Sequence, residues 1–258
     1  MLDLGNIKIT KPKKLLTTIN SKTTKGRKKG FETYIMYLAP HRQNSKGINL
    51  CSHASKGCAD ACLFYSGHAF FNNVQKGKIN KTEYFLNDRK GFLEQLDNEI
   101  TKIKKNHLSS ELQPVFRLNG SSDIAFEKFK IRDDKNIFEL HSDVIFYDYT
   151  KNYFRFKKEL PSNYHLTFSM SEENKDISMD MLKNGVNVAM VFHSPSNNLP
   201  DVYNGFKVIN GDETDLRFLD SKNGETVIVG LKFKFKTIKG SNNKDLIENN
   251  DFIINLDY

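Results

Sequence analysis

The chain has 258 residues, of which 38% are hydrophobic and 27% charged, and its formal net charge is +8. This composition is typical of a soluble globular protein that is long enough to bury a sizeable core. No apolar run approaches the ~20 residues that span a bilayer, and the opening residues lack the apolar segment of a secretory signal. We therefore expect a cytoplasmic protein with no membrane partner.

The positive charge is concentrated in an N-terminal arm, residues 1–30. Nine Lys or Arg residues lie there against a single acid, Asp3, so the rest of the chain is formally neutral. A basic arm can contact phosphates and release counterions, which suggests nucleic acid as a partner. A solvated tail without a ligand is the alternative.

Seven segments after the arm have the composition of strands. They are residues 31–40, 114–120, 143–149, 164–171, 185–194, 205–215 and 225–233. Strands that alternate with helices and short polar loops indicate βα units and a parallel sheet. One unbroken series favours a single domain over 31–258, and we expect an α/β fold, a partial TIM-like (βα) barrel with mostly parallel strands.

Helical patterns connect these strands. A long helix is predicted from about Lys81 to His107, where apolar residues recur near helical spacing: Phe85, Phe92, Leu93, Leu96 and Ile100. A short amphipathic segment is expected at 151–159, and a further helix contains Ile177, Met181 and Leu182. Because chemistry in βα barrels collects at the carboxyl ends of the strands, we expect the polar loops there to form one site.

All three cysteines lie in the loop 49–67, which follows the first predicted strand. Their spacing is C-x6-C-x3-C, and one helical turn would place Cys58 and Cys62 on the same side. Gly57 would allow a sharp turn that brings Cys51 close. Three thiolates suit three irons of a 4Fe–4S cluster and leave the fourth iron open. Zinc is the alternative, with a fourth ligand from one of three histidines: His41, His53 or His68.

Several segments carry a resemblance to known phage proteins. They are YLAPHRQNSKGINLCSHASKGCADACL, RLNGSSDIAFE, FYDYTKN and VINGDETDLRFLDSKNGETVIVGLKFK. Together they resemble the phage gene product 88 family over roughly residues 15 to 235. The cysteine segment is also similar to the phage gene product 37/68 group, whose members look like radical S-adenosylmethionine proteins.

The second resemblance implies a cofactor and a set of site residues. Cys51, Cys58 and Cys62 would hold the cluster, and its open iron would bind S-adenosylmethionine. The polar loop after the second strand would contact that cofactor, which implicates Asn119, Gly120, Ser121 and Ser122. The spacing of the cysteines and Ala61 before the last of them differ from the superfamily's usual pattern.

Further residues are candidates for the same site, each with a structural alternative. Arg117 and Asp123 flank the loop, where they form a buried pair or contact the substrate or cofactor. Ser169 and Ser171 line the site or cap a helix, with Glu172 or Glu173 following. The remaining candidates follow the later strands. They are Asp148, Lys151 and Asn152 for a ribose or phosphate, His193 as a base or a buried histidine, and Asp212, Glu213 and Asp215 for a cation or an ion-pair network with Arg217.

These observations favour a phage-encoded iron–sulfur protein of the host cytoplasm, a radical S-adenosylmethionine-type enzyme that needs an electron donor. Its substrate would be a nucleotide or nucleic acid. The alternative is a non-catalytic, zinc-clipped protein that binds nucleic acid or host machinery. No G-x-x-x-x-G-K-[ST], G-x-G-x-x-G, H-E-x-x-H or G-x-S-x-G motif is present, which disfavours ATPases, dinucleotide enzymes, metalloproteases and serine hydrolases.

Overall fold

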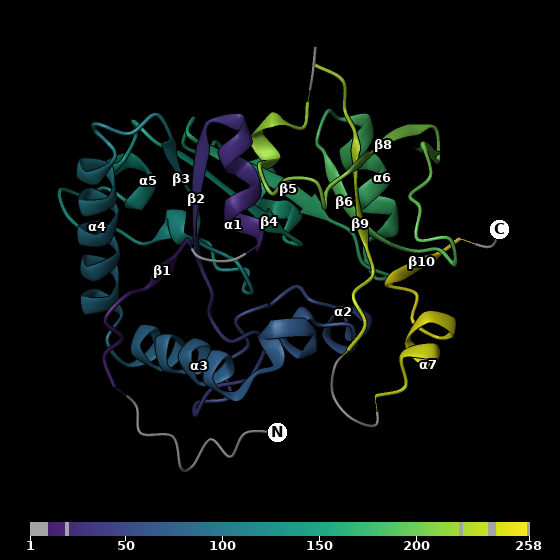
Figure 1. Ribbon diagram of the computed structural model, residues 1–258, viewed down its shortest axis with the longest axis horizontal. Helices are drawn as coiled ribbons and strands as arrows, with labels where there is room; N and C mark the ends of the chain where they lie inside the picture. The colour runs from purple at the N-terminus through teal and green to yellow at the C-terminus, as the bar shows by residue number, and fades with distance from the viewer. Residues whose placement is uncertain (1–9, 19–20, 222–223, 237–240, 257–258) are drawn as a thin grey trace. The chain divides into compact units, whose positions relative to one another are not determined.

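The computed structural model describes residues 10–18, 21–221, 224–236 and 241–256, with the backbone alone for residues 21 and 22 (Figure 1). The α/β class with mostly parallel strands is confirmed, and each of the seven predicted strands is present. The first nine residues of the predicted arm lie outside the described residues. None of the described helices is both long and apolar enough to cross a membrane.

The chain divides into two compact units, which we describe separately. Unit 1 comprises residues 1–52, 71–148 and 158–165, and unit 2 comprises residues 53–70, 149–157 and 166–258. The expectation of a single domain over 31–258 stays a prediction.

Unit 1 holds four strands in chain order. They are β1 Leu16–Thr17, β2 Phe31–Met36, β3 Gln113–Arg117 and the first part of β4 Ile145–Thr150. β2, β3 and β4 are parallel neighbours, and β1 pairs antiparallel with β2. The predicted arm therefore contributes a strand to the sheet. The backbone N–H groups of Leu15 and Leu16 also donate to the carboxylate of Glu99, at 2.8 and 3.0 Å.

Unit 2 continues with most of β5 Tyr164–Ser169 and with β6 Val188–His193, β7 Val202–Tyr203, β8 Phe206–Asn210, β9 Ile228–Lys232 and β10 Ile253–Asn255. β5, β6, β9 and β8 are parallel neighbours in that order, so the chain-order series ends at β6. β7 pairs antiparallel with β8, and β10 lies parallel to the end of β6.

The ten described strands do not close into a barrel. Their hydrogen-bonded order begins at β1 and ends at β7, and no described pairing joins these two strands. Closure requires every strand to have a partner on both sides. A complete (βα) barrel is therefore excluded for the described residues.

The described helices are α1 Ser21–Lys25, α2 Lys56–Asp60, α3 Asn72–Asn87, α4 Arg89–Asn106, α5 Ile137–Leu140, α6 Lys175–Lys183 and α7 Asn243–Glu248. The prediction of one long helix over 81–107 was wrong, because α3 and α4 are separated at Asp88. This residue has φ −138° and ψ 71°, outside the helical region, and its carboxylate accepts a hydrogen bond from Gly91 N at 2.9 Å. It thus begins α4 as an N-cap. The predicted segment 151–159 contains only a 3₁₀ helix, Tyr153–Lys157.

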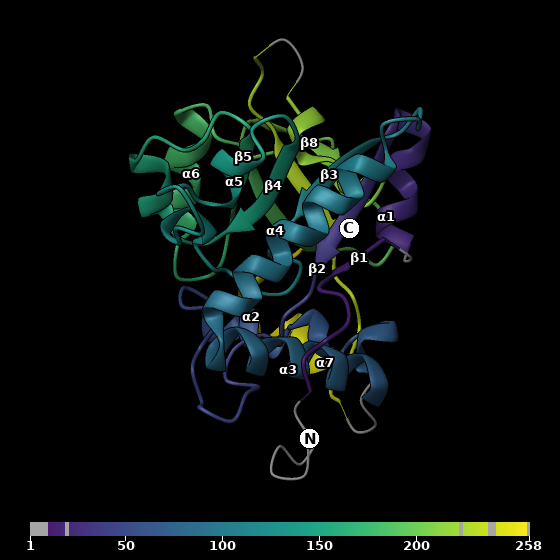
Figure 2. The same ribbon diagram turned by 90° about the vertical axis from the view of Figure 1, so that its left-hand side faces the viewer.

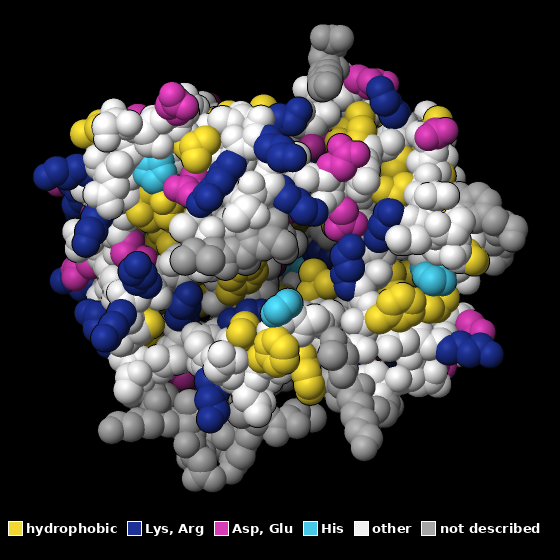
Figure 3. All heavy atoms as spheres, viewed as in Figure 1, with side chains coloured by type: hydrophobic (Ala, Val, Ile, Leu, Met, Phe, Trp, Pro, Cys, Tyr) yellow, Lys and Arg dark blue, Asp and Glu magenta, His cyan; other side chains and the backbone are white. Residues whose placement is uncertain are grey.

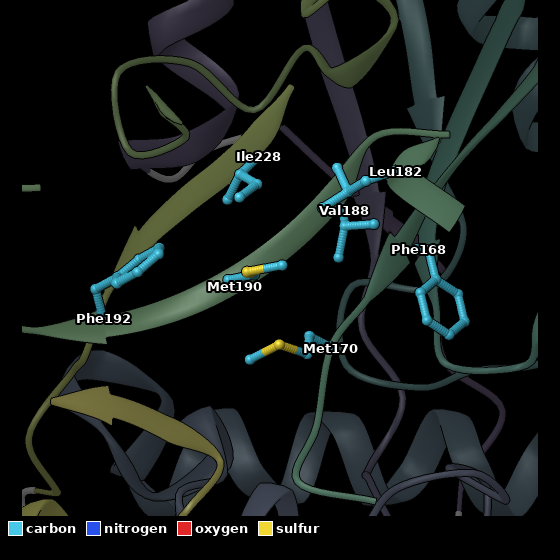
Figure 4. Close-up of a cluster of buried hydrophobic side chains, with 7 residues drawn as sticks. All are labelled: Phe168, Met170, Leu182, Val188, Met190, Phe192 and Ile228. Atoms are coloured by element: carbon cyan, nitrogen blue, oxygen red, sulfur yellow. The ribbon is translucent and has the colours of Figure 1, made fainter. Parts of the chain in front are cut away.

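Each unit has its own apolar core. In unit 1, α4 runs in front of β3 and β4 in the view of Figure 2, and the apolar side chains predicted for this helix are buried. Aromatic rings pack beneath, with Phe138 and Phe146 edge to face at a centroid distance of 4.9 Å. In unit 2, side chains of β5, β6, β9 and α6, together with Met170 directly after β5, form a second cluster (Figure 4): Phe168, Met170, Leu182, Val188, Met190, Phe192 and Ile228. These cores hold the strand ends and their polar loops in place.

Candidate functional site

The cysteine segment 49–67 spans both units. Cys51 belongs to unit 1, and Cys58 and Cys62 belong to unit 2. All three thiols are half-buried, and no disulfide joins them.

In unit 1, Cys51 lies beside the loop that follows β3. Its Sγ is 3.8 Å from the carbonyl oxygen of Ser121, and its backbone N–H donates to Asn49 Oδ1 at 2.9 Å. The N–H of Asp123 donates to the carbonyl of Leu50 at 2.9 Å. The first cysteine and the predicted cofactor loop therefore meet at the carboxyl ends of the adjacent parallel strands β2 and β3.

The loop after β3 is also fixed to the end of β2. Ser121 Oγ donates to the carbonyl of Leu38 at 2.6 Å, and Gly120 N donates to the carbonyl of Met36 at 2.9 Å. A Cβ atom at Gly120 would lie only 2.6 Å from side-chain atoms of Ile35 and Tyr37. Only glycine allows this close approach of the two segments.

A buried carboxylate, Asp148 in β4, fixes the shape of this loop through hydrogen bonds. It accepts hydrogen bonds from Asn119 N at 2.7 Å, Asn119 Nδ2 at 3.1 Å and the hydroxyl of Tyr164 at 2.9 Å. Asn119 Oδ1 in turn accepts from Ser122 Oγ at 2.9 Å and Ile124 N at 2.8 Å. These contacts give Asn119, Ser122 and Asp148 a loop-forming role.

The other predicted residues of this loop differ in exposure. Arg117 is buried within β3, where it pairs in register with Ile35. Gly120, Ser121 and Asp123 are half-buried. Of the residues predicted here, these three present the loop to solvent.

In unit 2, the helix that carries Cys58 is held at its N-terminus by Glu172, from the loop after β5. Ser55 caps α2, because its Oγ accepts from Cys58 N at 3.2 Å and donates to Glu172 Oε2 at 2.6 Å. Gly57 N donates to Glu172 Oε1 at 2.6 Å. Burial raises the pKa of Glu172, but the hydrogen bonds from Ser55 and from backbone N–H groups, with the charge of Lys151, outweigh it and hold the pKa below its usual range.

Gly57 is needed at this helix because other groups approach it closely. A Cβ atom there would lie 2.7 Å from Glu172 Oε1 and would also collide with the amide oxygen of Asn250. Asn250 Nδ2 donates to the carbonyl of Gly57 at 3.1 Å. The predicted sharp turn at Gly57 was wrong, because this residue lies inside α2.

Two further contacts tie unit 2 together around the cysteines. Lys151 Nζ donates to Ser169 Oγ at 2.6 Å and lies 5.1 Å from the ring centroid of Phe252. Phe252 belongs to an apolar cluster against which Cys58 packs, with Ala61, Phe233 and Ile253. Ser169 is therefore a hydrogen-bond partner of Lys151, and the predicted Ser171 cap is replaced by a hydrogen bond from Ser171 N to Asn174 Oδ1 at 2.6 Å.

The candidate zinc ligands and carboxylates have other surroundings. His53 and His68 are exposed, and His193 faces Phe233 and Phe235 edge-on, at centroid distances of 6.5 and 6.2 Å. Within the described ranges, no group of three or more His, Cys, Asp or Glu residues is arranged to hold a metal ion.

The acidic loop after β8 forms ion pairs. Asp212 Oδ2 accepts from Lys232 N at 3.0 Å and lies 3.2 Å from Lys234 Nζ. The predicted network around Arg217 includes Asp220, at 3.2 Å, which the sequence did not single out. Burial raises the pKa of Asp220 to about 6, against the opposing charge of Arg217.

Sequence reasoning missed Asn250 and named Glu172 only as a possible residue of a helix cap. Their partners lie 193 and 115 residues away in the chain, so no local pattern identifies these contacts.

Comparison with known protein families gives a match over most of the chain. A family model described as gene product 88 matches residues 13–248. No curated protein and no solved structure matches the chain.

Proposed function

Because the chain belongs to the phage gene product 88 family, we propose a function for it as a phage protein: it binds a 4Fe–4S cluster through Cys51, Cys58 and Cys62 and acts as a radical S-adenosylmethionine-type enzyme. The observation that carries the proposal is the 3.8 Å approach of the Cys51 thiol to the carbonyl of Ser121. It joins the cysteine segment to the predicted cofactor loop at the ends of neighbouring parallel strands, where sites of βα proteins form.

The proposal rests on the type of ligand and not on a preformed geometry, because no group of three or more His, Cys, Asp or Glu residues in the described ranges is arranged to hold a metal ion. Three half-buried thiols outside disulfides suit three iron ligands, and thiolates are the usual ligands of such clusters. The parallel, chain-ordered strands β2, β3 and β4 support the finer assignment to a partial barrel. When bound, the cluster and S-adenosylmethionine would supply one-electron chemistry.

The chain's own residues position the site. Glu172 and Ser55 hold the first turn of α2, so that Cys58 stays in place. Asp148 and Asn119 keep the loop after β3 in one shape, so that the backbone at Gly120 and Ser121 can face a cofactor. These groups orient and shield, and the cofactor provides the reactivity.

Metal analysis of the full chain, purified without oxygen, tests the proposal. We expect about four irons and four sulfides per chain, with a broad absorption near ~400 nm. Alanine at Cys51, Cys58 or Cys62 should abolish both. The control is Lys56→Ala on the same segment, whose exposed side chain forms an ion pair with Asp60, four residues along the chain. Colourless protein with one zinc per chain would refute the cluster and favour the zinc-clipped alternative.

Cofactor cleavage is a separate step with a separate measurement. The reduced, cluster-loaded protein incubated with S-adenosylmethionine should release 5′-deoxyadenosine, and Cys51→Ala should release none. A loaded protein that yields no 5′-deoxyadenosine would refute the enzymatic part and leave a cluster-binding protein.

A further inference from the structure

The end of the cysteine segment is joined to an unusual stretch that begins at the last residue of β9, Lys232–Phe233–Lys234–Phe235–Lys236. Ser66 forms an isolated antiparallel bridge with Lys236, and Ser66 Oγ donates to the carbonyl of Lys234 at 3.3 Å. Both stretches belong to unit 2. The residues directly after Cys62 therefore share a surface with alternating lysines and phenylalanines.

The two phenylalanines of this stretch differ in exposure. Phe233 is buried, whereas Phe235 leaves 54% of its surface exposed. The two rings are edge to face at a centroid distance of 5.3 Å, and His193 lies edge-on to both. The exposed ring of Phe235 thus packs against the buried ring of Phe233, which restricts its orientation before any ligand binds.

A second exposed group lies on the cysteine segment itself. Leu63, the first residue after Cys62, is 51% exposed. The ring of Tyr65 is covered by the ammonium of Lys236, 5.7 Å from its centroid. Hydrophobic side chains are exposed among Lys and Arg side chains on the face seen in Figure 3.

The charge of this surface is positive. Three lysines, Lys232, Lys234 and Lys236, alternate with the two phenylalanines. Lys234 pairs with Asp212 at 3.2 Å, and the ammonium of Lys236 lies over the ring of Tyr65. A cation over one aromatic ring, with the exposed ring of Phe235 next to it in the chain, fits a polymer that carries both anions and flat apolar groups.

We propose that this surface, formed by Leu63, Tyr65, Lys234, Phe235 and Lys236, binds single-stranded nucleic acid. Unstacked bases pack on the exposed rings, and phosphates contact the lysines, as in other proteins that bind single strands. A duplex keeps its bases paired and stacked, so it offers no free base face to Phe235. The inference that the bound strand is the substrate of the cysteine site rests on the proposed function. The binding of single-stranded nucleic acid to this surface does not rest on it.

Fluorescence anisotropy with the full chain and labelled 20-nucleotide single strands of DNA and of RNA tests the proposal. Phe235→Ala should raise Kd about tenfold, the usual effect of losing one stacked base. Lys236→Gln should reduce the slope of log K against log salt by about 0.7, the value for one phosphate contact on a single strand. Comparison of the DNA and RNA strands shows which one is preferred.

A matched control is available within unit 2. Phe154 is 52% exposed and also lies beside a lysine, with Lys157 Nζ 5.5 Å from its ring centroid, but it belongs to the 3₁₀ helix Tyr153–Lys157 and not to the stretch that pairs with Ser66. Phe154→Ala should leave Kd unchanged. Equal Kd values for Phe235→Ala and Phe154→Ala, or a duplex bound as tightly as a single strand, would overturn the proposal.

The same variants separate this inference from the proposed function. Phe235→Ala should keep the iron content and the thermal unfolding temperature of the wild type, because its ring is half exposed. A wild-type chain that contains iron but does not bind single strands would refute the proposed binding surface alone. A wild-type chain that binds single strands but contains no iron would refute the cluster alone.

Discussion

The contact between Glu172 and the start of α2 gives the sharpest prediction of stability. Glu172→Gln keeps the shape of the side chain but removes the negative charge of the carboxylate, which accepts hydrogen bonds from Ser55 Oγ and Gly57 N, each at 2.6 Å. Hydrogen bonds to a charged group contribute about 1.5–3 kcal/mol, against about 0.5–1.5 kcal/mol for neutral pairs. Two weakened bonds at a half-buried side chain therefore predict a loss of about 1–2 kcal/mol at pH 7.

The pH dependence of this loss follows from the direction of the pKa shift. The folded-state pKa of Glu172 lies below its ordinary value of 4.5, so the carboxylate stabilises the fold fully above that value. Its contribution is lost as pH falls through the folded-state pKa. The difference in unfolding free energy between wild type and Glu172→Gln should thus be largest at pH 7 and shrink below about pH 4.

Urea unfolding followed by far-UV circular dichroism measures the effect. A loss of about 1.5 kcal/mol lowers the midpoint by about 0.5 M if m is ~3 kcal/mol/M. Glu173→Gln, at the exposed neighbouring position, is the control and should stay within about 0.5 kcal/mol of wild type. A midpoint for Glu172→Gln that equals the control at pH 7, or a gap that does not narrow in acid, would contradict the assigned contact.

Three more changes test the assigned contacts. Gly57→Ala should lower the free energy of unfolding by about 1–3 kcal/mol in the same urea titration, because the new Cβ would lie 2.7 Å from Glu172 Oε1. Gly77→Ala in α3 is the control: the space around this position is open, so the change should be neutral or stabilising. Asp148→Ala should cost about 3 kcal/mol and lower the melting temperature, since it leaves three buried donors without their acceptor; a melting temperature equal to wild type would count against that network. The pKa of Asp220 is raised from 3.8 to about 6, so the folded state holds the proton of this carboxyl more tightly than the unfolded state does. The unfolding free energy of wild type relative to Asp220→Asn should therefore fall as pH rises from about 4 to about 6. A difference between the two proteins that stays constant over this range would refute the raised pKa.

The strands could be predicted because each has enough apolar or β-branched residues to give a pattern. β6, Val188–His193, is nearly all apolar and buried, as expected of a parallel strand with neighbours on both sides. β1, β7 and β10 have only two or three residues each, too few for any periodicity. Their pairing depends on partners elsewhere in the fold, which a local pattern does not contain.

Residue type alone singles out the cysteines and the loop after β3 as a candidate site, but it does not identify the residues that support them. The cysteines and the loop after β3 stand out by residue type, and in unit 1 the structure brings Cys51 and Ser121 together. The sequence suggests Asp148 as a ligand-binding carboxylate, yet burial turns it into a scaffold for Asn119. Whether a polar residue after a strand faces solvent or the core depends on tertiary packing, which its position in the chain does not reveal.

The bond from Asn250 to Gly57 also constrains the order in which the protein can form during translation. Its two residues are 193 positions apart, so at ~5–20 residues per second the ribosome needs about 10–40 s between them. Throughout that interval the segment with Cys58 and Cys62 lacks both the amide of Asn250 and the pairing of β10 with β6. A newly made chain therefore presents the thiols of Cys58 and Cys62 for about 10–40 s on a segment that lacks these later contacts.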